Sequence, residues 1–176
     1  MTRTRTVLLV GLLAIVAWSH APRATEAAEF DPQFIYAHSS PAVVFVAGFA
    51  EDKQMAGAGS IIRRDGLVLT NAHVVVNKET AQPYDRIWVF LKPDRVTGNQ
   101  HTDPARRIKA QVLAFDRDLD LALLQMEAPP QPLPVLPFGD AGLVQIGQRV
   151  VAIGHPEQGG LWSLTTGVIS AEFDDF

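Results

Sequence analysis

Cysteine is absent from this sequence of 176 residues. A disulfide scaffold is therefore excluded, and the core has to be held together by the burial of apolar side chains alone. A chain of this length can form one ordinary domain with such a core. The 13 glycines and 12 prolines, together with many short Val, Ile and Leu runs, favour a turn-rich β architecture over a helical one.

Long runs of lysine or arginine are absent as well, and the formal net charge is −4. Both features argue against a nucleic-acid binder. The basic pairs Arg63-Arg64 and Arg106-Arg107 are isolated, which is typical of solvated turns.

The apolar run over residues 7–18 has 12 residues, whereas a membrane span needs about 20. Arg3 and Arg5 precede this run and small residues follow it, which is the pattern of a secretory signal peptide. We therefore predict a signal peptide over residues 1–27; an uncleaved anchor reaching Ala21 is the alternative. Without those residues 12 basic and 18 acidic side chains remain, a net charge of −6. An exported protein without cysteine is more typical of the periplasm or cell envelope of a bacterium than of animal secretion.

The segment over residues 41–127 carries the pattern of β-strands separated by turns. Residues 42–47 form a continuous apolar run, typical of a strand that is covered on both faces. Asp65-Gly66 lies between two apolar segments and predicts a hairpin. In all there are six candidate strands, enough for a small closed barrel: residues 42–47, 60–62, 67–70, 85–91, 108–115 and 119–126.

The segments on either side of this predicted barrel differ from it. Residues 28–40 predict a short arm, and the four prolines within residues 128–134 predict a stiff linker. Residues 148–153 and 164–170 predict two further strands within residues 135–176. Two strands do not close a barrel, so we expect this second unit to be incomplete.

His73 and Asp120 are the residues of greatest chemical interest. An amide-cleaving serine needs a neutral imidazole to accept its proton, and a carboxylate to fix the tautomer of that imidazole. His73 follows the apolar strand 67–70, and in a strand Asp120 would share an apolar face with Ala122 and Leu124. A carboxylate there costs several kcal/mol unless it has a partner such as a histidine N–H. Taken alone, each residue is also compatible with a structural role, while Asp116 and Asp118 fit solvated turns.

Residues 57–76 read Gly-x-Gly, an apolar pair, a turn ending in Asp-Gly, and then Leu-Thr-Asn-x-His-Val. Residues 120–124 read Asp-Leu-Ala-Leu-Leu; Phe-Gly-Asp at 138–140, Ile-Gly at 146–147, residues 150–156 and residues 165–170 follow in order. These motifs resemble the HtrA/DegP-like trypsin-fold serine proteases, and the match covers residues 41–171.

The resemblance implies an all-β, trypsin-like double β-barrel fold in which the first barrel, 41–127, is complete and the second, 135–176, is truncated. It implies a serine endopeptidase of protein quality control, with His73 as the general base and Asp120 as its orienting partner. The partners it implies are polypeptide substrates or unfolded proteins, with a homo-oligomer left open, and it indicates no cofactor.

The chain departs from the family in one essential respect: no Gly-x-Ser-Gly-Gly turn is present. None of Ser60, Ser163 and Ser170 sits in a glycine-flanked turn of that kind. We therefore expect the chain as written to be inactive, and a fragment in preference to a natural truncation. The alternative is a truncated pseudo-protease that acts as a non-enzymatic peptide- or protein-binding module.

The sequence gives little support for a metal site or a nucleotide site. His101 and Asp103 form only a weak candidate metal pair in a predicted loop, and His155 is expected to face solvent in a turn. Gly57-Ala-Gly59 lacks the third glycine and the helix of a nucleotide site.

Overall fold

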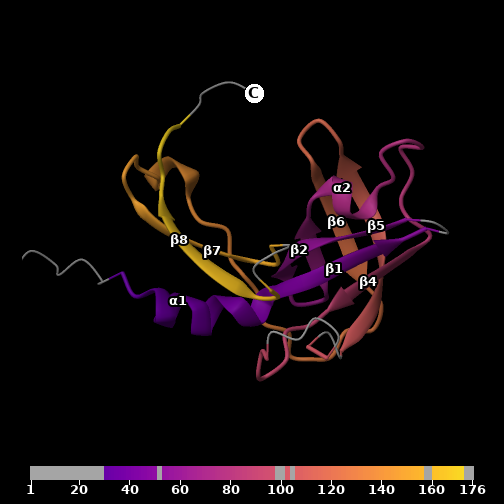
Figure 1. Cartoon of the computed structure of the whole chain (residues 1–176), viewed down its shortest axis with the longest axis horizontal. Helices are drawn as coiled ribbons and strands as arrows, with labels where there is room; N and C mark the ends of the chain where they lie inside the picture. Colours follow the sequence, from indigo (N-terminus) through magenta and orange to yellow (C-terminus); the bar gives the residue numbers. More distant parts are fainter. Residues whose placement is uncertain (1–29, 51–52, 98–101, 104–105, 157–159, 173–176) are drawn as a thin grey trace, which may run out of the picture.

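The computed structural model describes residues 30–50, 53–97, 102–103, 106–156 and 160–172. Six antiparallel strands form a closed barrel in the order β1-β2-β3-β6-β5-β4 (Figure 1). Their bounds are β1 Val43–Phe49, β2 Gln54–Arg63, β3 Leu67–Thr70, β4 Arg86–Phe90, β5 Arg107–Asp116 and β6 Leu121–Met126. The all-β prediction and the closed six-stranded barrel are confirmed.

The core of this barrel is apolar and rich in β-branched side chains. Val44, Val46 and Val89 are completely buried, as are Ile61 and Leu124. Strand β1 pairs with both β2 and β4 and is buried along most of its length, as its continuous apolar run predicts. The barrel is thus stabilised by apolar burial, the one route that the composition leaves open.

The β2–β3 turn depends on glycine. Gly66 has a φ of +94°, and its N–H donates to the carbonyl of Arg63 at 3.1 Å. A side chain at this position would be strained, and its Cβ would lie 2.9 Å from Cγ of Pro129. The Asp-Gly signal in the sequence therefore marks the turn correctly.

Two further strands, β7 (Arg149–Gly154) and β8 (Ser163–Val168), form a separate antiparallel sheet. Figure 1 shows this sheet beside the barrel, drawn in orange and yellow. A short 3-10 helix, η2 (Ala141–Leu143), precedes it. Several large apolar side chains around this sheet are exposed, namely Phe138, Leu143, Ile146 and Val168.

The arm predicted over residues 28–40 contains helix α1 (Pro32–Ser39), followed by the 3-10 helix η1 (Ser40–Ala42). Asp31 caps α1, because its carboxylate accepts hydrogen bonds from the backbone N–H groups of Gln33 and Phe34. Pro32 occupies the first turn, where its missing N–H costs nothing. The Asp-Pro pair therefore marks the start of a helix within the predicted arm.

The proline-rich segment over residues 128–134 forms no strand, and it contacts the barrel through Gln131 and Leu133. The side-chain amide of Gln131 donates to the carbonyl of Arg64 at 2.7 Å, and Leu133 is buried in the barrel core. The backbone N–H of Leu136 then donates to the carbonyl of Ile61 at 2.9 Å.

The prediction that His155 faces solvent is wrong. Its Nε2 donates to the carbonyl of Val44 at 3.0 Å, and its Nδ1 accepts the backbone N–H of Trp162 at 3.0 Å. The ring packs edge-on against Trp162 and Phe45. The sequence around His155 predicts a turn, but two of its partners, Val44 and Phe45, lie on β1, more than a hundred residues away.

The predicted signal peptide lies outside the described residues. Within the described part of the chain, no helix is long and apolar enough to cross a membrane.

Candidate active site

His73 lies on α2 (Ala72–Val75), a single helical turn that directly follows β3. Its neighbours Ala72, Val74 and Val75 are buried in the barrel core, so the helix is fixed while the His73 side chain stays 56% exposed. The close approach of α2 to β2 requires glycine at position 57, since a Cβ there would lie 2.6 Å from Cγ2 of Val74.

Asp120 ends the tight turn between β5 and β6. Asp116 stabilises this turn by accepting hydrogen bonds from the N–H groups of Asp118 and Leu119, both at 2.9 Å. The carbonyl of Asp120 then accepts the N–H of Ala72 at 3.2 Å, which ties the turn to α2.

The expectation that Asp120 belongs to a strand and points into an apolar layer is wrong. Strand β6 begins at Leu121, and Asp120 has a φ of +51°, a left-handed conformation that aspartate tolerates better than most residues. The alternation of the strand therefore does not extend to it, and its side chain is 41% exposed. The carboxylate is nevertheless directed at His73.

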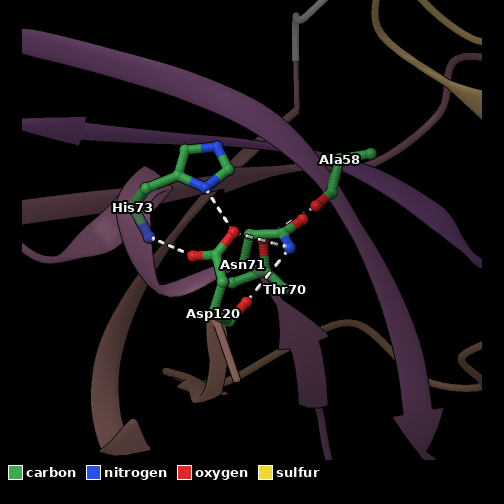
Figure 2. A network of polar contacts seen from close by, with 5 residues as sticks. All are labelled: Ala58, Thr70, Asn71, His73 and Asp120. Atoms are coloured by element: carbon green, nitrogen blue, oxygen red, sulfur yellow. Dashed lines mark hydrogen bonds and ion pairs between the residues drawn. The ribbon is translucent and has the colours of Figure 1, made fainter. Parts of the chain in front are cut away.

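Both carboxylate oxygens of Asp120 bind His73 (Figure 2). Oδ2 lies 2.7 Å from Nδ1 of the ring, and Oδ1 accepts the backbone N–H of His73 at 2.9 Å. With its proton on Nδ1, the ring presents the lone pair of Nε2 to an incoming hydroxyl. This geometry fixes the tautomer that a general base needs.

Asn71 also belongs to the site, although its sequence position suggests only that it turns the chain. Its side-chain amide donates to the carbonyl of Asp120 at 3.0 Å and to the carboxylate at 3.2 Å. The preceding residue, Thr70, donates its buried hydroxyl to the carbonyl of Ala58 on β2 at 2.7 Å (Figure 2). The sequence signal for both residues is the stretch Thr-Asn-x-His.

The pKa of Asp120 lies below its usual value. Partial burial raises this pKa, but hydrogen bonds from the backbone and ring of His73, with a smaller one from Asn71, outweigh it. Asp120 is therefore ionised at neutral pH, as an orienting carboxylate has to be.

The three serines considered from the sequence have other surroundings. Ser60 lies within β2, Ser163 donates its hydroxyl to the carbonyl of Gly160 at 3.0 Å, and Ser170 is exposed beyond β8. Across the described residues, the ring of His73 hydrogen bonds with Asp120 alone.

The candidate metal pair gains no support. His101 lies outside the described residues, and Asp103 is buried and accepts hydrogen bonds from the backbone and hydroxyl of Thr97. No cluster of three or more potential metal ligands occurs in the described part of the chain.

An open cavity of about 220 Å³ lies beside the His73–Asp120 pair. Its walls are formed by Ala72, His73, Val76, Lys78, Arg117 and Asp120.

The sequence matches known proteins over most of its length. The sequence model of the trypsin-like peptidase domain matches residues 57–175. A probable periplasmic DegP-like serine endoprotease of Halomonas elongata is 37% identical over 125 residues, which are 70% of this chain and 22% of the relative. The serine protease HTRA1 of Xenopus laevis is 35% identical over 142 residues, 74% of this chain and 26% of the relative. The chain thus spans about a quarter of the length of these relatives.

Solved structures show the same similarity. The crystal structure of the serine endoprotease from Yersinia pestis superposes with a TM-score of 0.62 at 29% identity, covering 82% of this chain and 46% of that one. An HtrA-type protease with a tripeptide gives a TM-score of 0.63 at 25% identity, covering 81% and 40%.

Proposed function

The chain belongs to the trypsin-like peptidase family, and on that premise we propose that it supplies the general base and the orienting carboxylate of an HtrA/DegP-like serine endopeptidase. The observation that carries this proposal is the contact of 2.7 Å between Nδ1 of His73 and Oδ2 of Asp120. The second contact, from the backbone N–H of His73 to Oδ1, fixes the carboxylate from the other side.

In this role, Nε2 of His73 takes the proton of a serine hydroxyl as that oxygen attacks the scissile carbonyl of a polypeptide. His73 then returns the proton to the leaving amine. Asp120 remains ionised, keeps the Nδ1 proton on the ring and stabilises the imidazolium that forms. Asn71 keeps the carboxylate in position through its contacts with both the side chain and the backbone of Asp120.

The nucleophile is the missing component, because the sequence contains no Gly-x-Ser-Gly-Gly turn. Loss of the serine in enzymes of this kind costs about 10⁶ in turnover. We therefore expect a polypeptide of these 176 residues to hydrolyse no casein above buffer and to react with no fluorophosphonate probe. Specific labelling that disappears on His73→Ala would show that one of its serines is reactive.

The decisive test uses the gene. An in-frame Gly-x-Ser-Gly-Gly codon run after the codon for Phe176 would support the endopeptidase, whereas a stop codon would support a non-enzymatic binding module. If the run is present, the protein made from the whole reading frame should hydrolyse casein. His73→Ala should abolish that activity, and Asp120→Asn should lower kcat by about 10⁴, since asparagine favours the wrong tautomer.

For location, we propose the bacterial periplasm. The DegP-like relatives of Halomonas elongata and Hahella chejuensis are named as periplasmic, and residues 1–27 have the composition of a signal peptide. N-terminal sequencing of the exported protein should begin near Ala28, and a membrane-bound product that retains Thr2 would contradict export.

A further inference from the structure

The cavity beside His73 contains two cations that the proposed mechanism does not use. Lys78 lies shortly after α2, and Arg117 lies in the β5–β6 turn. Part of the cavity wall is apolar, formed by the buried residues Ala72 and Val76. The cavity therefore combines an apolar wall with a positively charged rim, and it adjoins the base.

Arg117 is held at this rim by the backbone. Its guanidinium Nη2 donates to the carbonyl of Lys78 at 3.2 Å, which joins the β5–β6 turn to the segment after α2. Its sequence neighbour Asp116 forms no ion pair with it within the described residues, and Oδ1 of that carboxylate accepts the amides of Asp118 and Leu119. As far as the structure describes the chain, the remaining N–H groups of the guanidinium have no partner and are available to a ligand.

No ion pair involves Lys78 or Arg117 within the described residues. Glu79, which follows Lys78, binds the ammonium group of Lys53 at 2.6 Å. Both oxygens of Asp120 are already occupied by His73. In an acidic chain, this leaves two neighbouring cations without a carboxylate of their own.

We propose that Lys78 and Arg117 form a subsite for an acidic side chain, Asp or Glu, of the polypeptide substrate. Arginine offers a planar pair of donors that matches a carboxylate, and lysine adds a second positive charge. Ala72 and Val76 accommodate the aliphatic part of the same side chain. This inference rests on the proposed function, since it takes the cavity at His73 as a place where a polypeptide binds.

The test is an NMR titration of the isotope-labelled chain with two capped hexapeptides. Both are polyalanine, and they differ only in one central residue, Glu or Gln; the capped ends carry no charge. We expect the Glu peptide to shift the amides of residues 72–78 and 116–120 and to bind at least about tenfold more tightly than the Gln peptide. Raising the salt from about 0.05 M to about 0.5 M should weaken this preference, because exposed charges are screened.

Variants at the rim supply the controls. Lys78→Gln and Arg117→Gln should each reduce the preference for Glu, and Arg117→Glu should shift it towards a Lys peptide. Arg64→Gln makes the same change of charge at the β2–β3 turn and should leave the preference intact. Equal binding of the two peptides, no binding of either, or an unchanged preference in the double variant K78Q/R117Q would overturn the proposal.

The same spectra separate this proposal from the proposed function. The Nδ1 proton of His73 should give a downfield resonance that disappears in Asp120→Ala. If that resonance is present and no acidic preference is found, the subsite is wrong and the base assignment stands. If the nitrogen shifts of neutral wild-type His73 place its ring proton on Nε2 instead of Nδ1, the proposed function itself fails.

Discussion

At the scale of single residues, His155 lies in an environment that strongly disfavours the charged form of its ring. Burial lowers the pKa of His155 from 6.5 to about 4, and the hydrogen bond to the carbonyl of Val44 only partly offsets this. Protonation of Nδ1 would place a donor against the N–H of Trp162, which already points at that atom. The folded state therefore requires a neutral ring.

This requirement predicts a loss of stability in mild acid. Between pH 6.5 and 4 the unfolded chain binds a proton at His155 and the folded chain does not, so the free energy of unfolding falls as the pH falls through this window. Over the whole window the loss is at most about 3.5 kcal/mol, taking about 1.4 kcal/mol for each pH unit. Urea unfolding at pH 7, 6 and 5 should show it.

The non-titrating variants His155→Gln and His155→Asn are the controls. Gln can still donate to the carbonyl of Val44, and Asn can still accept the N–H of Trp162. Both should be less stable than wild type at pH 7, but their stability should depend less on pH between 7 and 5. Carboxylates with lowered pKa values, such as Asp65 and Glu79, do not account for the loss between pH 7 and 5. In the folded chain they bind protons only below their usual pKa values of 3.8 and 4.5. An unchanged pH dependence in both variants would contradict the assignment.

At the scale of elements, the position of α2 depends on its contact with β2. Val74 is 1% exposed and branched at Cβ, so it cannot easily move away from a new methyl group at position 57. The position of His73 relative to Asp120 depends on this contact, because His73 precedes Val74 on the same single turn of helix.

We expect Gly57→Ala to lower the free energy of unfolding by about 1–3 kcal/mol, the usual cost of overpacking, and to shift α2. The downfield proton of His73 should weaken in the same variant, because α2 carries the ring. Gly167→Ala in β8 is the matched control, since no atom lies within 4 Å of its added Cβ. If Val74→Ala restores the His73 signal in the Gly57→Ala background, the clash is the cause. Equal effects of the two glycine substitutions would refute it.

At the scale of the whole molecule, local patterns in the sequence predict the barrel well and the contacts between distant segments poorly. Short apolar runs mark all six barrel strands, although the run at 60–62 covers only the end of β2, and the Asp-Gly pair marks the β2–β3 turn. The pairing of His73 with Asp120 follows from family motifs, but the left-handed turn at Asp120 does not. Alternation along a strand carries no information on where that strand begins.

The β7–β8 sheet shows the same limit. Its sequence predicts two strands of an incomplete barrel, with no sign of a contact to the first barrel. In the structure, however, Trp162 is 2% exposed and donates its indole N–H to the carbonyl of Val43 at 2.8 Å. The carbonyl of Trp162 accepts the hydroxyl of Tyr36 from α1, also at 2.8 Å. Trp162 has a φ of +52°, which costs about 1–3 kcal/mol for a bulky residue. The hydrogen bonds around it offset that cost, so one residue joins the arm, the barrel and the second sheet.

Amide hydrogen exchange tests this arrangement. The sequence predicts fast exchange over residues 135–176 and protection over residues 42–47 and 119–126. From the contacts of Trp162 we expect instead that β7 and β8 are protected as long as Trp162 is in place. Trp162→Ala should therefore accelerate exchange in Arg149–Gly154 and Ser163–Val168 while leaving Val43–Phe49 and Leu121–Met126 protected, because the barrel closes without the second sheet. Trp162→Phe keeps an aromatic ring but removes the indole donor, so its exchange rates should fall between wild type and Trp162→Ala. If Trp162→Ala exposes the barrel strands as much as β7 and β8, the two parts unfold as one unit and the barrel is not independent.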